Sequence, residues 1–377
     1  MDVLGTVLAF IGVLVVLVLV HELGHFVVAK RAGITVQEFG VGFPPRIASV
    51  VWHGTRYSLN WIPLGGFVKM LGEDGDVEAD KMRQRGLSEA AVEKAMEGAF
   101  NRKPIWIRIV VLVAGVVMNF LLAAVLFAAA LSLPGTEGHG PLTVTEIQPD
   151  SPAVTAGLEV GDVILAADGR TFDVSRDLTA YVRSRAGNVV DLTIRRAGTE
   201  TETVIHVTPR KLSDADEAKG LGAVGFSYEP DRFVEVPPTV ANPAEAAWKG
   251  FTTAADLARQ IPGGLASAVA GLLGLAPDAG TAVGPIGIAS ETGRVLEAPL
   301  AVQLFFVGIL SVNLAVLNVL PFPPLDGGRI AVVAIEAVRR RRLPAEREAL
   351  VYLTGFMVLI ALVILISIRD VANLIGG

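Results

Sequence analysis

The sequence predicts an α-helical polytopic membrane protein with four transmembrane helices and an inserted, extracytoplasmic, β-rich domain. The chain of 377 residues is 52% hydrophobic, which is high for a soluble protein. Four segments are apolar and long enough to span a bilayer, which takes about 20 helical residues. Between the second and third of these lies a polar stretch with the alternation and the Pro, Gly and Asp turns that are typical of β-strands.

The predicted membrane helices cover residues 1–29, 109–133, 300–320 and 350–368. The third ends at a proline-rich turn, and its segment extends over 300–328 to include the L-D-G-G sequence that follows. The first helix resembles a signal peptide in length, but it lacks a basic beginning and a small-x-small cleavage site. We therefore expect it to be retained as a membrane helix.

Lysine and arginine residues indicate the orientation, because they accumulate in cytoplasmic loops. They cluster after the first helix, before the second, and between the third and fourth. We therefore expect 30–108 and 329–349 to be cytoplasmic, and both termini and the insert 134–299 to lie outside. The arginines at 339–342 lie between two predicted membrane helices, so we expect them to fix the orientation of these helices and not to bind nucleic acid. The net charge of −6 likewise predicts no nucleic-acid partner.

The insert contains the sequence SPAVTAGLEVGDVILAADG, which resembles the signature of a PDZ domain. The resemblance covers about residues 138–212 and implies a small β-barrel-like fold with two helices and a peptide groove beside an exposed strand. Residues 192–194 and 203–207 read as a hairpin within it. A peptide ligand for this domain, a role as a size filter for substrates, and a generic β domain without a ligand all remain open.

The segment 213–299 is predicted to be an extracytoplasmic, amphipathic linker at the membrane surface. Trp248, Phe251 and Leu257 lie on or near one helical face, and an amphipathic helix of low charge suits the outer interface. The apolar stretch 261–280 is interrupted by Gly and Pro, so we expect it to associate with the membrane without spanning it.

The first membrane helix contains the sequence H-E-L-G-H, with His21, Glu22 and His25. Histidines four residues apart project from one helix face and can bind a single Zn²⁺, and the glutamate between them lies where a general base is needed. Ionisable residues inside a membrane helix are rare and indicate function. The absence of cysteine excludes thiolate ligands and disulfides. These residues therefore predict a zinc hydrolase site within the membrane.

A catalytic zinc site needs a third protein ligand besides water. Asp326 follows the proline-broken end of the third helix, and a broken helix at membrane depth is tolerated where it lines a cavity or is buried in protein. A carboxylate there needs a partner such as zinc, although an N-cap of the next helix is its alternative role. The weaker candidates lie in the polar segments. They are His53, His139 and His206, none of which follows the motif at metzincin spacing, and Glu38 and Glu73, which we expect to be solvated surface residues.

H-E-L-G-H together with NVLPFPPLDGG at 318–328 resembles the site-2 protease family of intramembrane zinc metalloproteases. The single PDZ-like insert narrows the resemblance to the bacterial regulator-of-sigma-E protease branch. Supporting matches occur at 63–74, at 100–115, at Asn119 and at 284–290, so the resemblance spans nearly the whole chain. It implies a multi-pass protein of the bacterial cytoplasmic (inner) membrane.

In this family, two histidines and an aspartate bind zinc and the glutamate of the first motif activates water. The resemblance therefore implies Zn²⁺ ligands at His21, His25 and Asp326. It implies Glu22 as the catalytic base, and Asn318 of the N-x-x-P-x-P segment as a residue that holds the substrate backbone.

Two positions depart from the family pattern. Val116 stands where Pro is frequent, and Arg329 stands where His is frequent. Neither is an implied zinc ligand, so the predicted chemistry is unaffected, and Arg329 is expected to alter only the local contacts of the site.

A short strand is predicted at the start of the sequence GGFVKML, with Gly65, Gly66, Phe67 and Val68. In the resembled family, a membrane-associated cytoplasmic β-hairpin near this point resembles a docking edge for unwound substrate. Strand addition would supply hydrogen bonds to a substrate helix that must unwind before cleavage. A plain loop strand is the alternative.

The resemblance implies cleavage of single-pass membrane proteins within the lipid bilayer, after a first cut on their outer side. Anti-sigma factors and signal-peptide remnants are the implied substrates, and the released piece would change transcription. Two other classes of membrane protein fit the sequence less well. A PDZ scaffold with a structural zinc would normally fill all four zinc positions with protein ligands, and a transporter would be expected to show inverted repeats, which are not visible.

Overall fold

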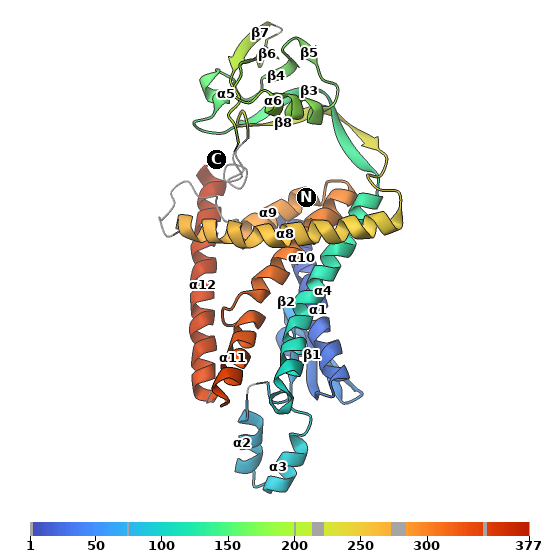
Figure 1. Cartoon of the computed structure of the whole chain (residues 1–377), viewed down its shortest axis with the longest axis vertical. Coiled ribbons are helices and arrows are strands. Elements are labelled where there is room, and N and C mark those ends of the chain that lie inside the picture. The colour runs from blue at the N-terminus through green and yellow to red at the C-terminus, as the bar shows by residue number, and fades with distance from the viewer. Residues whose placement is uncertain are drawn as a thin grey trace. The chain divides into compact units, whose positions relative to one another are not determined.

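The computed structural model describes residues 3–73, 75–199, 201–212, 222–272, 284–341 and 345–376 (Figure 1). The chain divides into two compact units, which we describe separately. The first comprises 1–130, 242–262 and 283–377, and the second comprises 131–241 and 263–282.

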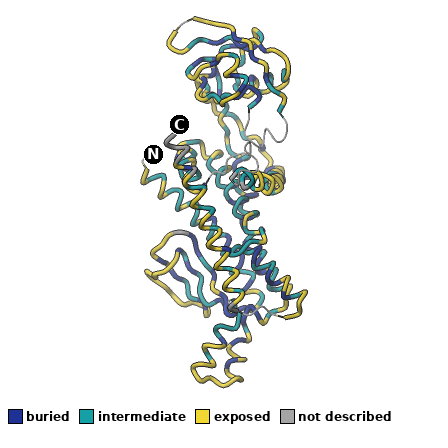
Figure 2. The backbone as a smooth tube through the Cα atoms, turned by 90° about the vertical axis from the view of Figure 1, so that its left-hand side faces the viewer, coloured by how far each residue is buried: buried dark blue, intermediate teal, exposed yellow. Residues whose placement is uncertain are grey.

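Four helices are long and apolar enough to cross a membrane, which confirms the predicted number for the described part of the chain. They are α1 (Val3–Arg31), α4 (Ile105–Ser132), α10 (Leu300–Val319) and the 347–368 part of α12 (Ala345–Gly376). Helix α4 begins at Ile105 rather than at the expected residue 109, because the preceding Pro104 allows a helix to start directly after it. Much of the outer surface of these helices is exposed and apolar, as contact with lipid requires (Figure 2).

Small residues let the helices of the first unit approach closely. A Cβ atom on Gly24 of α1 would lie 2.4 Å from the carbonyl oxygen of Ala114 of α4. Phe127 of α4 packs against Gly308 of α10, where a Cβ atom would lie 2.6 Å from the ring. Small residues at such crossings are a usual feature of membrane helix packing, since no hydrophobic effect drives helices together in lipid.

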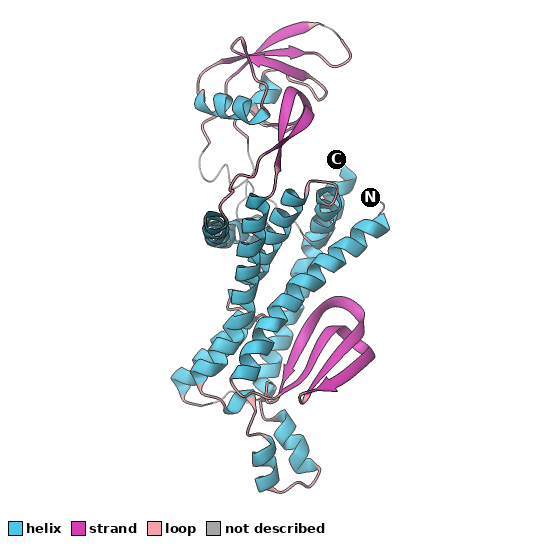
Figure 3. Ribbon diagram, turned by 90° about the vertical axis from the view of Figure 1, so that its right-hand side faces the viewer, coloured by secondary structure: helices cyan, strands magenta, loops and turns pink. Residues whose placement is uncertain are grey.

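The segment between α1 and α4 contains a two-stranded antiparallel sheet of β1 (Val36–Trp52) and β2 (Thr55–Met70), as predicted. Both strands bend, so that Gly40 of β1 pairs with Ser58 on one side and with Phe67 on the other. Residues 66–70 pair with β1 alone among the described strands and therefore form an edge of this sheet. Figure 3 shows the sheet beside α1, which β2 contacts. Short helices α2 (Val77–Gln84), α3 (Glu89–Ala95) and η1 (Phe100–Arg102) follow.

Helix α10 ends at Val319, and α11 (Asp326–Arg339) begins after a proline-rich turn. Prolines lack the amide hydrogen that would continue the helical ladder, so the break is dictated by the sequence. Asp326 is the first helical residue of α11 and its side chain forms no cap, which excludes the N-cap role for it. Helix α9 (Pro285–Val295) contacts both α1 and α12.

The second unit contains a sheet with the strand order β7-β6-β4-β3-β8, in which β5 also pairs with β4. Its core is formed by apolar residues of these strands and of α6, among them Leu142, Ile164, Leu178 and Leu192. The strands are β3 (Gly135–Ile147), β4 (Val163–Ala167), β5 (Arg170–Thr171), β6 (Val190–Arg195), β7 (Glu202–Val207) and β8 (Phe226–Val236). Among the described residues, the helices that accompany this sheet are α5 (Pro152–Thr155) and α6 (Ser175–Ser184). The predicted hairpin corresponds to the antiparallel pair of β6 and β7.

Two expectations for the region after residue 212 need correction. Strand β8 belongs to the sheet, because it pairs with β3 along most of its length and Phe226 packs on the core, so the domain does not end at 212. Helix α8 (Pro243–Leu272) continues through Pro262 and the glycines after it, where an interruption was expected. Residues 273–280 of the predicted membrane-associated stretch lie outside the described residues.

Candidate active site

Helix α1 presents its two histidines on one buried face. His21 and His25 are each 6% exposed, and they are brought side by side by one helical turn, with their Nε2 atoms 3.2 Å apart. Glu22 between them is only half-buried. The helix thus separates two inward-facing imidazoles from a carboxylate directed to their side.

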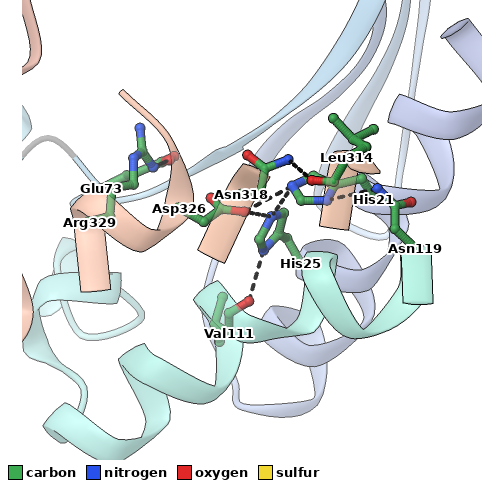
Figure 4. Close-up of polar contacts among 9 residues, drawn as sticks. All are labelled: His21, His25, Glu73, Val111, Asn119, Leu314, Asn318, Asp326 and Arg329. Atoms are coloured by element: carbon green, nitrogen blue, oxygen red, sulfur yellow. Dashed lines mark hydrogen bonds and ion pairs between the residues drawn. The ribbon is translucent and has the colours of Figure 1, made fainter. Parts of the chain in front are cut away.

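Asp326 at the start of α11 completes a three-residue cluster with these histidines (Figure 4). Its Oδ2 atom lies 2.9 Å from Nε2 of His21 and 3.2 Å from Nε2 of His25. Oδ2 is buried and has no hydrogen-bond partner of good geometry among the described residues. A carboxylate oxygen in that situation needs a cation.

The turn that positions Asp326 depends on the glycines after it. A Cβ atom on Gly327 would lie 2.2 Å from the carbonyl oxygens of Val319 and Leu320. A Cβ atom on Gly328 would lie 2.7 Å from the backbone nitrogen of Pro323. Only glycine therefore lets α11 fold back against the end of α10, which explains the Gly-Gly of the L-D-G-G sequence.

The donor atoms fit a zinc ion. Tetrahedral zinc bonds of about 2.0–2.2 Å would separate ligand atoms by roughly 3.4 Å, close to the 2.9–3.2 Å observed among the three atoms. Gly115 of α4 provides the space beside them: a Cβ atom there would lie 2.4 Å from Nε2 of His25 and 2.8 Å from Nε2 of His21. Two imidazoles and one carboxylate, three protein ligands in all, are the composition of a catalytic rather than a structural zinc site.

Groups on α4 orient both imidazoles. Nδ1 of His25 donates a hydrogen bond to the carbonyl oxygen of Val111 at 2.8 Å, which leaves Nε2 without a proton and free to bind a metal. Nδ1 of His21 lies 3.4 Å from the amide nitrogen of Asn119, whose Oδ1 atom has no partner among the described groups. Rotating this amide by 180° would place Oδ1 opposite an Nδ1–H group and satisfy both. Each imidazole then presents Nε2 to the same point.

Of the residues predicted to bind substrate, Asn318 lies near this cluster and Gly66 lies near Glu22. Asn318 is on the last turn of α10, close to Asp326 in Figure 4, and its amide nitrogen donates to the carbonyl oxygen of Leu314 at 2.9 Å. A Cβ atom on Gly66 would lie 3.8 Å from Cγ of Glu22, so the edge of β2 passes beside the glutamate. Gly65 has a positive φ of 107° at the start of this edge, and Val68 is buried.

The weaker ligand candidates are all separate from the cluster. His139 pairs with Asp173 and His206 with Asp191 in the second unit, while His53 lies in the turn between β1 and β2. Glu38 forms an ion pair with Arg46. Glu73 was expected to be a solvated surface residue, but its side chain is 14% exposed and it forms an ion pair with Arg329.

Sequence reasoning missed the contributions of α4. Neither the carbonyl group of Val111 nor the missing side chain of Gly115 has a signature in a single sequence, since both act through the crossing of α1 and α4. Asn119 had been noted only as a family match. An uncharged membrane helix with an isolated asparagine was the one available signal, because buried amides in lipid need partners.

Comparison with known proteins gives a consistent result. The model of the family described as "Peptidase family M50" matches residues 9–362. A Clostridium perfringens protein that carries a zinc-metalloprotease name is 35% identical over 94% of this chain and 95% of its own. The metalloprotease MmpA of Caulobacter vibrioides is 31% identical over 97% and 96% of the two chains. The regulator of sigma-W protease RasP of Bacillus subtilis is 28% identical over 98% and 99%.

One solved structure, the PDZ domain of an SdrC-like protein from Listeria monocytogenes, is 23% identical and covers 23% of this chain and 85% of its own, with a TM-score of 0.20. A TM-score this low does not establish a shared fold.

Proposed function

This chain belongs to peptidase family M50, the site-2 proteases, and from that premise we propose that it hydrolyses peptide bonds in or near the transmembrane segment of single-pass membrane proteins. It is a zinc metalloprotease and a multi-pass membrane protein. One observation carries the proposal: His21, His25 and Asp326 converge where α1 and the α10–α11 break meet, and α1 is long enough to span a bilayer. A protease site within the membrane can reach the peptide bonds of transmembrane segments, which lie in the membrane as well.

We assign the zinc ligands to His21, His25 and Asp326. Their separations and the orphaned Oδ2 atom of Asp326 support this assignment. When bound, Zn²⁺ supplies a Lewis acid for the scissile carbonyl and lowers the pKa of a bound water to about 7.

We assign the role of general base to Glu22. Its place between the ligands and its partial exposure allow its carboxylate to accept a proton from the attacking water and later to donate it to the leaving amine nitrogen. Glu22 is not part of the cluster of ligand atoms formed by His21, His25 and Asp326, which leaves its carboxylate available for proton transfer.

The edge of β2 at Gly65, Gly66, Phe67 and Val68 is proposed to hold the unwound substrate backbone. It lacks a strand partner on its outer side among the described strands, and it runs beside Glu22. A substrate strand added there would recover the hydrogen bonds that it loses on unwinding. Asn318, whose amide oxygen is not used by its bond to Leu314, could satisfy a further backbone amide.

The sheet itself is proposed to be membrane-associated. Its outer part exposes large apolar side chains in numbers that are unusual for a water-facing sheet. They include Ile47, Val50, Val51, Trp52, Leu59 and Trp61. Contact with lipid would cover this surface and would place the docking edge at the depth of the substrate.

The basic residues support a cytoplasmic location for 30–108 and 329–349, and an outside location for the termini and the inserted domain. We propose that the insert is a PDZ domain. A groove of 90 Å³ lies between α6 and the segment that enters β8, lined by Leu178, Val182, Phe226 and Tyr228. Strand β8 is at the edge of its sheet, so a peptide could add to it.

The proposed substrates are anti-sigma-factor-like proteins or signal-peptide remnants already shortened on their outer side. The name of the Bacillus subtilis relative, a regulator of a sigma-W pathway, supports this class. Cleavage would release a cytoplasmic piece that changes transcription, and the inserted domain would exclude or recognise the outer part of the substrate.

The test is cleavage of a truncated, tagged single-pass substrate in proteoliposomes. Glu22→Gln should reduce cleavage at least ~10²-fold, because it removes the general base, while zinc content measured by mass spectrometry stays at the wild-type level. Glu97→Gln, an exposed position in the same loop as the docking sheet, is the matched control and should cleave normally. Undiminished cleavage by Glu22→Gln would overturn the mechanism. Zinc without any cleavage by the wild-type chain would favour a scaffold.

A further inference from the structure

A basic pocket of 460 Å³ lies between the beginning of α4 and the end of α11, away from the zinc cluster. Five basic residues and one acidic residue line it, together with the apolar residues Pro104, Ile105 and Ala337. The charged residues are Arg102, Lys103, Arg108, Arg340, Arg341 and Glu336.

The acidic residue does not neutralise this pocket. Oε2 of Glu336 accepts a hydrogen bond from Arg108 at 2.9 Å, and both side chains are nearly buried, at 8% and 11% exposure. This pair therefore lies at the buried end of the pocket. Arg102 has only distant carboxylates, at 3.7 and 3.8 Å. Within the described ranges, no carboxylate lies within 4.0 Å of the side-chain nitrogens of Lys103, Arg340 or Arg341, so the rim carries surplus positive charge.

The pocket lies at one end of a membrane span. Ile105, which lines it, is the first residue of α4, and Trp106 beside it is 67% exposed. Tryptophan at the end of a membrane helix marks the level of the lipid headgroups. An exposed apolar stripe continues along α4 from there, through Val110, Val117, Leu121 and Val125.

We propose that this pocket binds the phosphate group of an anionic phospholipid whose acyl chains lie along the exposed stripe of α4. The cationic rim matches a phosphodiester, and the first amide groups of α4 add positive potential at the same point. A zwitterionic lipid would bring its own ammonium group into the pocket and would be disfavoured. The apolar stripe selects a lipid rather than a soluble phosphate. The site is independent of the zinc chemistry.

The test uses the full-length protein in mixed phosphatidylglycerol and phosphatidylcholine micelles, with retained lipid counted by native mass spectrometry. Wild type should retain phosphatidylglycerol in preference to phosphatidylcholine. In the double variant Arg340→Gln/Arg341→Gln, retention of phosphatidylglycerol should fall about 30-fold, because each lost basic group near a lipid surface weakens binding about fivefold. Arg85→Gln/Lys94→Gln removes the same charge from exposed positions outside the pocket and should change little.

Several results would overturn the proposal. One is equal retention of the two lipids by the wild-type protein, and another is an equal loss in the control variant. A third is displacement of the retained phosphatidylglycerol by millimolar inorganic phosphate, which would identify a site for soluble anions. If the double variant loses its thermal unfolding transition, Lys103→Gln provides the same comparison with a single charge, and an unchanged retention there would count against the site.

Discussion

Gly115 contributes no atom that could bind zinc, yet it controls whether the three ligands can meet. It lies on α4 against the imidazoles of α1, and any side chain there would collide with the Nε2 atoms that face the proposed metal ion. Val111 and Asn119 lie one helical turn to either side of Gly115 on α4 and hold the outer nitrogens of the imidazoles. The face of α4 thus positions the ligands, although α1 and α11 provide them.

The substitution Gly115→Ala should therefore weaken zinc binding strongly. Its Cβ atom would lie 2.4 Å from Nε2 of His25, which the imidazole can avoid only by leaving the ligand position. We expect zinc affinity to fall by about 100-fold or more, at the upper end of the losses caused by misplaced metal ligands, and cleavage to fall with it. Zinc content and competition with a chelator measure this directly.

Gly12→Ala is the matched control, because a Cβ atom there meets nothing within 4 Å. This variant should bind zinc like the wild type and should be slightly more stable, since alanine favours a helix more than glycine does. Wild-type zinc affinity in Gly115→Ala would contradict the assigned geometry.

Strand β2 and helix α11 are joined by one ion pair. Glu73 follows the docking edge and accepts a hydrogen bond from the backbone amide of Met70 at 3.1 Å, while its other oxygen is bound by Arg329 of α11. Arg329 lies one turn after Asp326 on the same helix and also stacks over the ring of Tyr352. The pair therefore ties the end of the proposed substrate strand to the helix that carries the third ligand. Arg329 stands where His is frequent in the family, and Glu73 is its ion-pair partner in this chain.

A double-mutant cycle with Glu73→Gln and Arg329→Gln should show a coupling free energy of about 1–3 kcal/mol in unfolding, as expected for a partly buried pair. The single variants should also raise the KM for the substrate more than they change zinc content, because they loosen the strand and not the ligands. The exposed pair Glu291 and Arg294 on α9 serves as the comparison and should show a coupling of at most about 0.5 kcal/mol. A coupling that small between Glu73 and Arg329 would show that the pair does not join the two elements.

The elements differed in how far they could be predicted from the sequence. The four membrane helices and the β6–β7 hairpin were predictable, because long apolar runs and alternating patterns are local signals. Strand β8 was missed, since its alternation is short and is interrupted by Pro230 and Asp231, and since its partner β3 is distant in the sequence. Proline and glycine predicted a break in α8, but tertiary packing on α4 and α10 holds the first part of that helix.

The residues of the candidate site that belong to local sequence motifs were predictable, and those that act through contacts between distant elements were not. His21, Glu22 and His25 follow from a five-residue motif, and Asp326 from a proline-broken helix at membrane depth. The contributions of Gly115 and of the Glu73–Arg329 pair depend on contacts between elements that are far apart in the chain, which no local pattern encodes.

The sheet of the inserted domain begins and ends at neighbouring residues. The chain enters it at Gly135 and leaves it at Val236, and these two residues are paired neighbours in β3 and β8. Its core is formed by residues of its own strands and helices. Such an insertion can be removed with little strain, because a short linker can bridge the two ends.

Replacing residues 135–236 by a short Gly-Ser linker should therefore leave zinc content and cleavage of a truncated substrate unchanged. If the domain filters substrates by the size of their outer part, the shortened protein should also cut a substrate that retains its outer domain. The full chain should cleave that long substrate at least about tenfold less than the shortened protein does. Thr179→Glu, which places a charge in the groove beside β8 at a half-buried position, distinguishes the two roles of this domain. A peptide-binding role predicts that Thr179→Glu behaves like the deletion, because a charge in the groove disfavours an apolar ligand. A size filter predicts that it behaves like the wild type, since the bulk of the domain is kept. Continued rejection of the long substrate by the shortened protein would show that selection resides in the membrane unit itself.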